Sequence, residues 1–174
     1  MKTLPFALCA VLLSSTALAD HWQEEPEHRG SQITVAVNGL NCATNAGASE
    51  FDAHSWSWSA SNSGSTGSGA GSGAGKASLG TLMIKKAFDA CSPQLLAAVT
   101  SGKHFSSLVL TQEDYNGNTV ATVKLTEVLV SSWSVGGNTR DNDPEESVAF
   151  TFGKVCLSAG SSMACYDVTL GRTT

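Results

Sequence analysis

Apolar and polar residues alternate with a period of two along most of this chain, which is typical of strands that bury one face. The first such run extends from Ile33 to Val37 and stops at the turn-forming pair Asn38-Gly39. Later runs predict further strands over residues 51–60, 79–88, 105–112, 119–130 and 148–152. The sequence therefore predicts a protein that is mainly β.

The alternation also predicts which side chains face the core. Leu82 and Ile84 share one face of their strand, and Phe88 continues that face. The same period places a second set on one core face, namely Val148, Phe150 and Phe152. We expect both sets to be buried.

One segment has the features of a helix instead. Ser92 suits an N-cap, Pro93 the first helical position and Gly102 the C-terminal stop. The apolar stripe over residues 94–101 consists of Leu95, Leu96 and Val99. A single short helix among strands is expected to cover an open face or an end of the sheet.

Two turns predict antiparallel hairpins. Asn116-Gly117 separates residues 105–112 from residues 119–130, and Asn-Gly is a strong hairpin signal. Gly160-Ser161 separates two short runs near the C-terminus with glycine first, as in a type II′ turn. Short strands, hairpins and one helix predict an antiparallel β-barrel or sandwich with one short α-helix.

A long Gly/Ser-rich extended loop interrupts this pattern between Trp56 and Lys86. Loops of this length inside a compact domain are usually functional or disordered. Its glycines are Gly64, Gly67, Gly69, Gly71, Gly73, Gly75 and Gly80. A phosphate-binding loop ending at Lys76 would need glycine at position 70 and a hydroxyl at 77, where this chain has Ala70 and Ala77. A flexible tether is the simpler alternative.

Two tryptophans precede the loop. Trp56 and Trp58 share one strand face by the two-residue period, and His54 shares it with them. Such a pair is more often a core or subunit contact than a sugar-binding platform. A secreted module that binds glycans through exposed tryptophans is the alternative that remains open.

The N-terminus has the features of a secretory signal peptide. Lys2 is followed by an apolar run from Leu4 to Leu13, and Ala17-Leu18-Ala19 fits a cleavage site. The apolar run is too short to span a bilayer. We therefore expect a signal peptide over residues 1–19, a polar tail over 20–30 and one β-domain over 31–174, exported to the periplasm or the extracellular space.

Four cysteines remain after the leader, which favours two disulfides in an exported chain and leaves three connectivities open. A zinc site is the alternative, but no short Cys-x-x-Cys pair is present. A hairpin through Gly160-Ser161 would place Cys156 opposite Cys165 at a non-hydrogen-bonded pair, close enough for a bridge. That pairing leaves Cys42 to pair with Cys91.

Charge and chemistry exclude several function classes. Ten Lys/Arg against fifteen Asp/Glu give a net charge of −5, which argues against nucleic acid or an anionic membrane as partner. His54 and His104 are separate, and neither a nucleophile elbow nor a clustered metal-ligand spacing is present. Asp89 and Glu127 are the carboxylates most worth inspection. We expect no enzyme activity, no cofactor and no metal.

In the order of its motifs, the chain resembles the haemolysin-coregulated protein (Hcp) family, the tube-forming proteins of type VI secretion systems, from Ile33 to about Leu170. The residues that carry the resemblance are Trp56-Ser57-Trp58, Gly73-Ala74-Gly75-Lys76, Leu82, Lys85 or Lys86, Asp89, Ser92-Pro93, Leu95 or Leu96, Ser101-Gly102-Lys103-His104-Phe105, Leu125 to Ser132 and Tyr166-Asp167-Val168. The leader and the four mature cysteines depart from the family pattern, because family members are normally loaded from the cytoplasm without a signal peptide and are not usually disulfide-bonded.

The resemblance implies a compact β-barrel with one short helix that assembles with itself into a hexameric ring. In the family, rings stack into tubes, and the long loop reaches from one ring to the next. The tube carries or conducts effector proteins, and the family has no catalytic residues to transfer.

Overall fold

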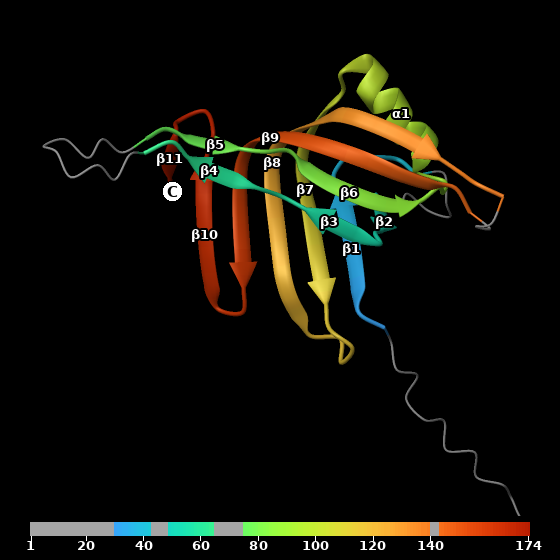
Figure 1. Ribbon diagram of the computed structural model, residues 1–174, viewed down its shortest axis with the longest axis horizontal. Helices are drawn as coiled ribbons and strands as arrows, with labels where there is room; N and C mark the ends of the chain where they lie inside the picture. The colour runs from blue at the N-terminus through green and yellow to red at the C-terminus, as the bar shows by residue number, and fades with distance from the viewer. Residues whose placement is uncertain (1–29, 43–48, 65–74, 140–142) are drawn as a thin grey trace, which may run out of the picture.

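The computed structural model in Figure 1 describes residues 30–42, 49–64, 75–139 and 143–174, which form one helix and eleven strands. The strands are β1 (Gln32–Val37), β2 (Glu50–Asp52), β3 (Ser55–Ser57), β4 (Ala60–Asn62), β5 (Ala77–Leu79), β6 (Leu82–Ala87), β7 (His104–Glu113), β8 (Thr119–Gly136), β9 (Glu145–Ala159), β10 (Ser162–Asp167) and β11 (Arg172–Thr173). The helix α1 (Ser92–Ser101) lies between β6 and β7 in the chain. The predicted mainly β class with one short helix is confirmed.

Nine strands form one antiparallel sheet built around two long strands. Its order is β11-β10-β9-β8-β7-β1-β2, and β6 pairs with both β9 and β3. β9 takes part in two pairings because its first half pairs with β6 and its second half with β10. Figure 1 shows β8 and β9 curving from one end of the sheet to the other. Their curvature folds the sheet over its own core.

The sheet does not close into a complete barrel within the described residues. β2 pairs with β1 and β3 pairs with β6, but Ala53 and His54, which lie between β2 and β3, belong to neither ladder. The Ala53 N–H donates to the Ile33 carbonyl and the His54 N–H to the Lys85 carbonyl, both at 2.8 Å. The single strand predicted over residues 51–60 is therefore wrong, because the chain divides it among β2, β3 and β4 to pair with three different strands.

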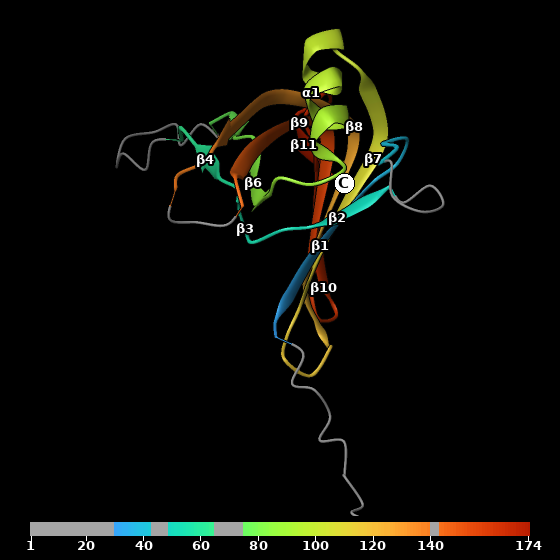
Figure 2. The ribbon, with the colours of Figure 1, turned by 90° about the vertical axis from the view of Figure 1, so that its right-hand side faces the viewer.

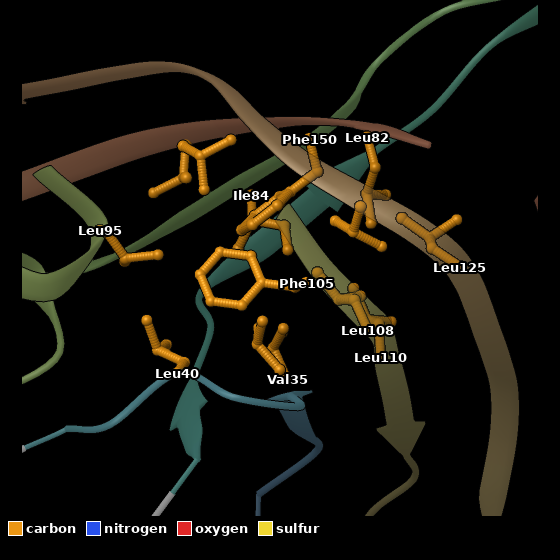
Figure 3. Close-up of a cluster of buried hydrophobic side chains, with 14 of the residues drawn as sticks. Val35, Leu40, Leu82, Ile84, Leu95, Phe105, Leu108, Leu110, Leu125 and Phe150 are labelled. Atoms are coloured by element: carbon orange, nitrogen blue, oxygen red, sulfur yellow. The ribbon is translucent and has the colours of Figure 1, made fainter. Parts of the chain in front are cut away.

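The core contains most of the side chains that the alternation predicted. Leu82, Ile84, Val148 and Phe150 are fully buried, and Figure 3 shows several of the core residues around Phe105. Phe152 is only half-buried at the edge of this cluster. The prediction for Phe88 is wrong, since 45% of it is exposed. The strand β6 ends at Ala87, so its period does not extend to Phe88.

The helix begins at Ser92 and ends before Gly102, close to the predicted bounds. The N-cap is Cys91, without a side-chain cap, so the predicted capping role of Ser92 is wrong. The Ser92 hydroxyl instead accepts a hydrogen bond from the Asp89 backbone N–H at 2.9 Å. Gly102 adopts φ 64° and donates its N–H to the Ala98 carbonyl, which is the left-handed stop that favours glycine.

The apolar stripe of the helix differs from the predicted one. Leu95 is fully buried as expected, but 42% of Leu96 is exposed. The buried residues of the helix are Ser92, Leu95 and Ala98. Two of these three positions carry small side chains, so the buried stripe contains less apolar surface than the predicted one.

The β7–β8 turn is organised by Asp114. Its carboxylate accepts hydrogen bonds from the backbone N–H groups of Asn116 at 2.8 Å and Asn118 at 2.9 Å. The hydrogen bond from the Asn118 backbone, followed by that from the Asn118 side chain, lowers the pKa of Asp114. Gly117 adopts φ 78° between them, as the predicted Asn-Gly hairpin requires.

Acid should therefore weaken this turn. Because the pKa of Asp114 is lower in the folded chain, its contribution is present above the unfolded pKa and is lost as the pH falls through the lowered value. We expect the hydrogen-exchange protection of the Asn116 and Asn118 amides to fall with that titration. Asp114→Asn should make the protection independent of pH over the same range, and a protection that follows no carboxyl titration in the parent would contradict the assignment.

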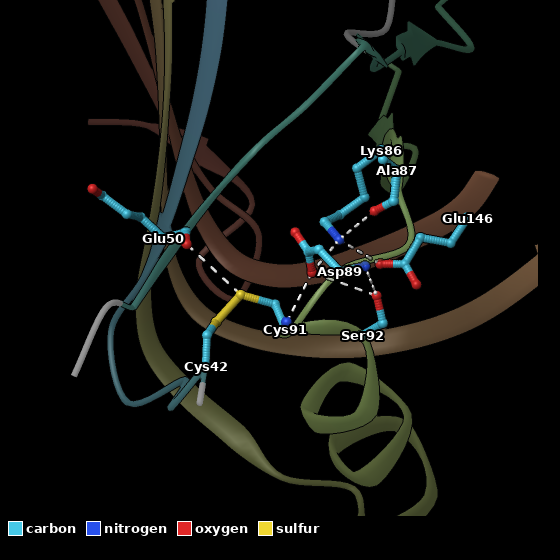
Figure 4. The surroundings of a disulfide bond; sticks show 8 residues. All are labelled: Cys42, Glu50, Lys86, Ala87, Asp89, Cys91, Ser92 and Glu146. Carbon is cyan, nitrogen blue, oxygen red and sulfur yellow. Dashed lines mark hydrogen bonds and ion pairs between the residues drawn. A yellow bond between two sulfur atoms is a disulfide. The ribbon is translucent and has the colours of Figure 1, made fainter. Parts of the chain in front are cut away.

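The structure contains two disulfides. Cys156 and Cys165 are directly opposite on β9 and β10, with Cα atoms 4.0 Å apart. Cys42 and Cys91 join the segment after β1 to the start of α1, with Cα atoms 4.4 Å apart, and both residues are buried (Figure 4). The first bridge lies within one hairpin, whereas the second links distant parts of the chain.

Candidate interaction surface

β4 and β5 form a separate two-stranded ribbon at the base of the Gly/Ser-rich loop. Ala60 pairs with Leu79 and Asn62 with Ala77, and all of β4 is exposed. Figure 1 shows the ribbon extending away from β3 and β6 toward the loop. Within the described residues, neither ribbon strand has a second ladder partner. Unpaired strand edges are surfaces to which another chain can add.

Local contacts fix the ribbon to the domain. The Gly80 N–H donates to the Ser59 carbonyl at 2.8 Å, and the Trp58 indole N–H donates to the Gly80 carbonyl at 3.0 Å. A Cβ at Gly80 would lie 2.6 Å from the Ser59 hydroxyl oxygen. Glycine therefore lets the two strands approach closely where the ribbon leaves the domain.

The other end of the ribbon, near the Gly/Ser-rich loop, also requires a glycine where its two strands approach closely. A Cβ at Gly75 would overlap the backbone of Gly64 across the ribbon and come within 2.5 Å of the Asn62 side-chain oxygen. Lys76 follows as an exposed residue. The predicted loop glycines Gly67, Gly69, Gly71 and Gly73 lie outside the described residues. Of the three loop glycines that are described, Gly64, Gly75 and Gly80, the last two are needed where the strands of the ribbon come together.

The two tryptophans pack against their own domain. Both are half-buried, and the Trp56 indole N–H donates to the side-chain oxygen of Gln112 at 3.0 Å. The Trp58 ring meets the edge of Phe152 with centroids 6.1 Å apart. Their indole N–H groups are already used, so the pair does not form an exposed platform for glycans.

A buried ionic network connects the ends of several elements (Figure 4). The ammonium group of Lys86 is fully buried and contacts Glu146 at 2.8 Å and Asp89 at 2.7 Å. It also donates to the Ala87 carbonyl at 2.8 Å. The second carboxylate oxygen of Glu146 accepts the Trp133 indole N–H at 3.0 Å. The three donors of the lysine and both carboxylate oxygens of Glu146 are thus satisfied, as buried charges require.

This network also reaches the buried disulfide. The Asp89 carboxylate accepts the Cys91 backbone N–H at 2.8 Å, and the Phe51 ring lies 5.1 Å from the Lys86 ammonium. The network and the disulfide together join β2, β6, β8, β9 and the start of α1. The carboxylate of Asp89 is therefore structural, and Glu146 is buried although its neighbour Glu145 is exposed.

The other residues with possible catalytic chemistry do not form a reactive group. His54 is exposed beside Glu145 at 3.8 Å. His104 and Glu127 both line one hollow of about 520 Å³, but no hydrogen bond joins them. The described residues contain no cluster of three His, Cys, Asp or Glu side chains that could hold a metal. Among these residues there is also no helix with the length and apolar character needed to cross a membrane.

Comparisons with known proteins agree on one family. The sequence profile described as "Type VI secretion system effector, Hcp" matches residues 30–158. Protein hcp1 of Pseudomonas aeruginosa strain PAO1 is 45% identical over 111 residues, which cover 62% of this chain and 68% of that protein.

Solved structures share the fold. The crystal structure of Hcp1 from Salmonella typhimurium has a TM-score of 0.70 at 22% identity, covering 84% of this chain and 100% of the other. A type VI secretion system effector from Yersinia pestis has a TM-score of 0.64 at 22% identity, covering 78% and 99%. A further type six secretion system protein reaches a TM-score of 0.73 at 20% identity, covering 82% and 99%. At these identities the similarity establishes the fold.

Proposed function

Because this chain belongs to the Hcp family of type VI secretion system proteins, we propose that it is the subunit of a hexameric ring that stacks into tubes. The chain is a secreted structural protein and not an enzyme. In the proposal, its partners are copies of itself and the effector proteins that the tube carries or conducts. Neither nucleic acid nor a membrane is part of this function.

The observation that carries the proposal is the exposed ribbon at the base of the Gly/Ser-rich loop. The ribbon has a defined conformation at its base, since β4 and β5 are paired and the Gly80 N–H donates a hydrogen bond to the Ser59 carbonyl. It also leaves its outer strand edges unpaired within the described part of the chain. A protruding strand pair with free edges suits contact with a neighbouring subunit. We infer that the segment from Gly64 to Lys76 makes the ring-to-ring contact.

We further propose that the protein works outside the cytoplasm. The signal peptide over residues 1–19 would direct export, and the polar tail over residues 20–30 would precede the domain over 31–174. Two disulfides support an oxidising compartment, because such bonds are rare in cytosolic proteins. The working location is then the periplasm or the extracellular space.

The oligomeric mass tests this function. We expect size-exclusion chromatography with light scattering to give a species of six chains, and electron microscopy to show rings and stacked tubes. A protein that stays monomeric at all accessible concentrations would rule the proposal out.

Removal of the loop should separate ring formation from stacking. In a variant without residues 64–75, we expect six-chain rings to persist while tubes disappear. The folded domain that forms the ring would remain, and only the protruding segment that contacts the next ring would be lost. The control variant keeps the loop and carries Asn116→Asp at the β7–β8 turn, where Asp-Gly is compatible with the same hairpin. It should form both rings and tubes. Tubes that form normally without the loop would refute its stacking role.

A further inference from the structure

We propose that the Glu127 carboxylate is a docking point for a cationic side chain of a second copy of this chain, and that Lys76 supplies it. This inference rests on the proposed function, because it names one contact between copies in the assembly. It assigns a partner to two charged residues that have none within the described part of their own chain.

Glu127 lies where the sheet changes its pleat. Ser106, Glu127 and Gly153 are neighbours on β7, β8 and β9, and the ladders between these strands lack a pair at that level. The buried positions of β8 change parity at Glu127. After Glu127 they are the even-numbered Val128 and Val130, and before it they are the odd-numbered Val123 and Leu125. All three strands therefore bend together, and the bend turns Glu127 toward solvent.

The backbone of Glu127 is in a disfavoured conformation. Its φ of 54° is the one positive value for a non-glycine residue in the described part of the chain. The neighbouring strand makes room for its side chain, since a Cβ at Gly153 would lie 2.5 Å from a carboxylate oxygen of Glu127 and 3.2 Å from its Cβ. Such outliers are kept where the surrounding structure holds them, and they are frequent at binding sites.

Glu127 also separates two hollows on this face. One hollow of about 340 Å³ is lined by Thr126, Glu127, Gly153, Lys154 and the β10–β11 turn. The other, of about 520 Å³, is lined by His104, Phe105, Ser106 and Glu127. A long side chain from a partner can therefore reach the carboxylate from either side.

The carboxylate has no partner of its own. No ion pair or hydrogen bond among the described residues includes the Glu127 side chain. Lys154 lines the same hollow and still makes no ion pair with it. The other carboxylate at this site, Asp167, already accepts the Leu170 backbone N–H at 2.8 Å. Glu127 thus presents an open negative charge.

The chain offers few cations that could meet it. Lys86 is buried in the network, Lys85 pairs with Glu145, and Lys103 donates to the Gly39 carbonyl. Of the described cations without an ion pair, Lys124, Lys154 and Arg172 belong to the same sheet region as Glu127. Lys76 is the remaining one, and it is exposed immediately before β5.

Lys76 and Glu127 lie on different sides of the domain. The ribbon is anchored through Trp58, which packs against the core, whereas Thr126 and Lys154 beside Glu127 alternate with the buried Leu125 and Val155. Figure 2 shows the ribbon standing to one side of β10, while one end of β8 and β9 arches over toward it. A contact between unlike surfaces on different sides can repeat from copy to copy, as closed rings and stacked rings both require.

Charge reversal tests the contact. We expect Glu127→Lys and Lys76→Glu each to raise the protein concentration needed for half-assembly by roughly tenfold or more, since like charges at an interface are strongly unfavourable. The double variant should return it to within about threefold of the parent, because the pair is restored with its sign exchanged. Light scattering across a dilution series measures all of these concentrations.

Controls make the outcomes separable. Lys124→Glu reverses an exposed charge near Glu127 on β8, and Glu50→Lys reverses an exposed charge on β2; neither should change assembly. Glu127→Gln, which keeps the shape, should weaken assembly less than Glu127→Lys, and circular dichroism confirms that each variant is folded. If the parent assembles but the single variants match it, or the double variant shows no recovery, this inference is wrong and the proposed function stands. A monomeric parent would overturn both.

Discussion

Glu146→Leu should lower the free energy of unfolding by about 3–5 kcal/mol, the usual effect of removing one partner from a buried ion pair. In this variant the fully buried Lys86 keeps only Asp89 as a counter-charge. The Trp133 indole N–H also loses its acceptor. Because domains of this size are stable by only about 5–15 kcal/mol, the loss should be visible as a large fall in the urea midpoint and in Tm.

The neighbouring residue provides a matched control. Glu145 is half-exposed, and its contacts with Lys85 and His54 are both at 3.8 Å. Glu145→Gln should therefore change the free energy of unfolding by about 0.5 kcal/mol or less. Two adjacent glutamates with different responses would show that burial and pairing, rather than acidic charge in this region, determine the effect.

A double variant separates the ion pair from the space that it fills. Lys86→Met together with Glu146→Leu removes both charges and keeps similar volume, and such replacements are often neutral or stabilising. We expect it to recover most of the stability lost in Glu146→Leu, although Asp89 and the Trp133 N–H each lose a partner. A double variant less stable than Glu146→Leu, or a single variant within about 1 kcal/mol of the parent, would contradict the role of the network.

The fold could be predicted where a local pattern determines it. Alternation identified the buried faces at Leu82, Ile84, Val148 and Phe150, because a strand with one buried face must repeat every two residues. It could not reveal that residues 51–60 divide into three strands. That division depends on which strands lie beside them in space, and such information is absent from a local period.

The candidate site was less predictable because its chemistry comes from tertiary contacts. Lys86 continues the face of Leu82 and Ile84, and Glu146 shares a face with Val148, so the pattern placed both charges at core positions. A charged residue at a core position indicates a buried ion pair, and this was the sequence signal from which the network could have been predicted. Nothing in the local sequence indicates the positive φ of Glu127, which depends on Gly153 in another strand.

Removing the disulfides should destabilise the chain unequally. Replacing both Cys42 and Cys91 with alanine releases a loop of 49 residues, for which the chain-entropy relation gives a loss of about 4 kcal/mol. The same exchange at Cys156 and Cys165 releases 9 residues and gives about 2.5 kcal/mol. The difference is expected to grow because the first pair is buried and the Cys91 backbone N–H donates to Asp89 in the ionic network.

Urea unfolding of the two double variants measures this order directly, with the oxidised parent as reference. Cys156 and Cys165 are half-exposed, so a mild reductant should open their bridge while the domain stays folded. Cys42 and Cys91 are 1% and 3% exposed, so their bridge should open only when the domain unfolds around it. Equal losses in the two variants, or faster reduction of Cys42–Cys91, would mean that this bridge does not hold the start of α1 against the sheet. The order expected here follows from that attachment, because the bridge joins the segment after β1 to the element that positions Asp89 beside Lys86.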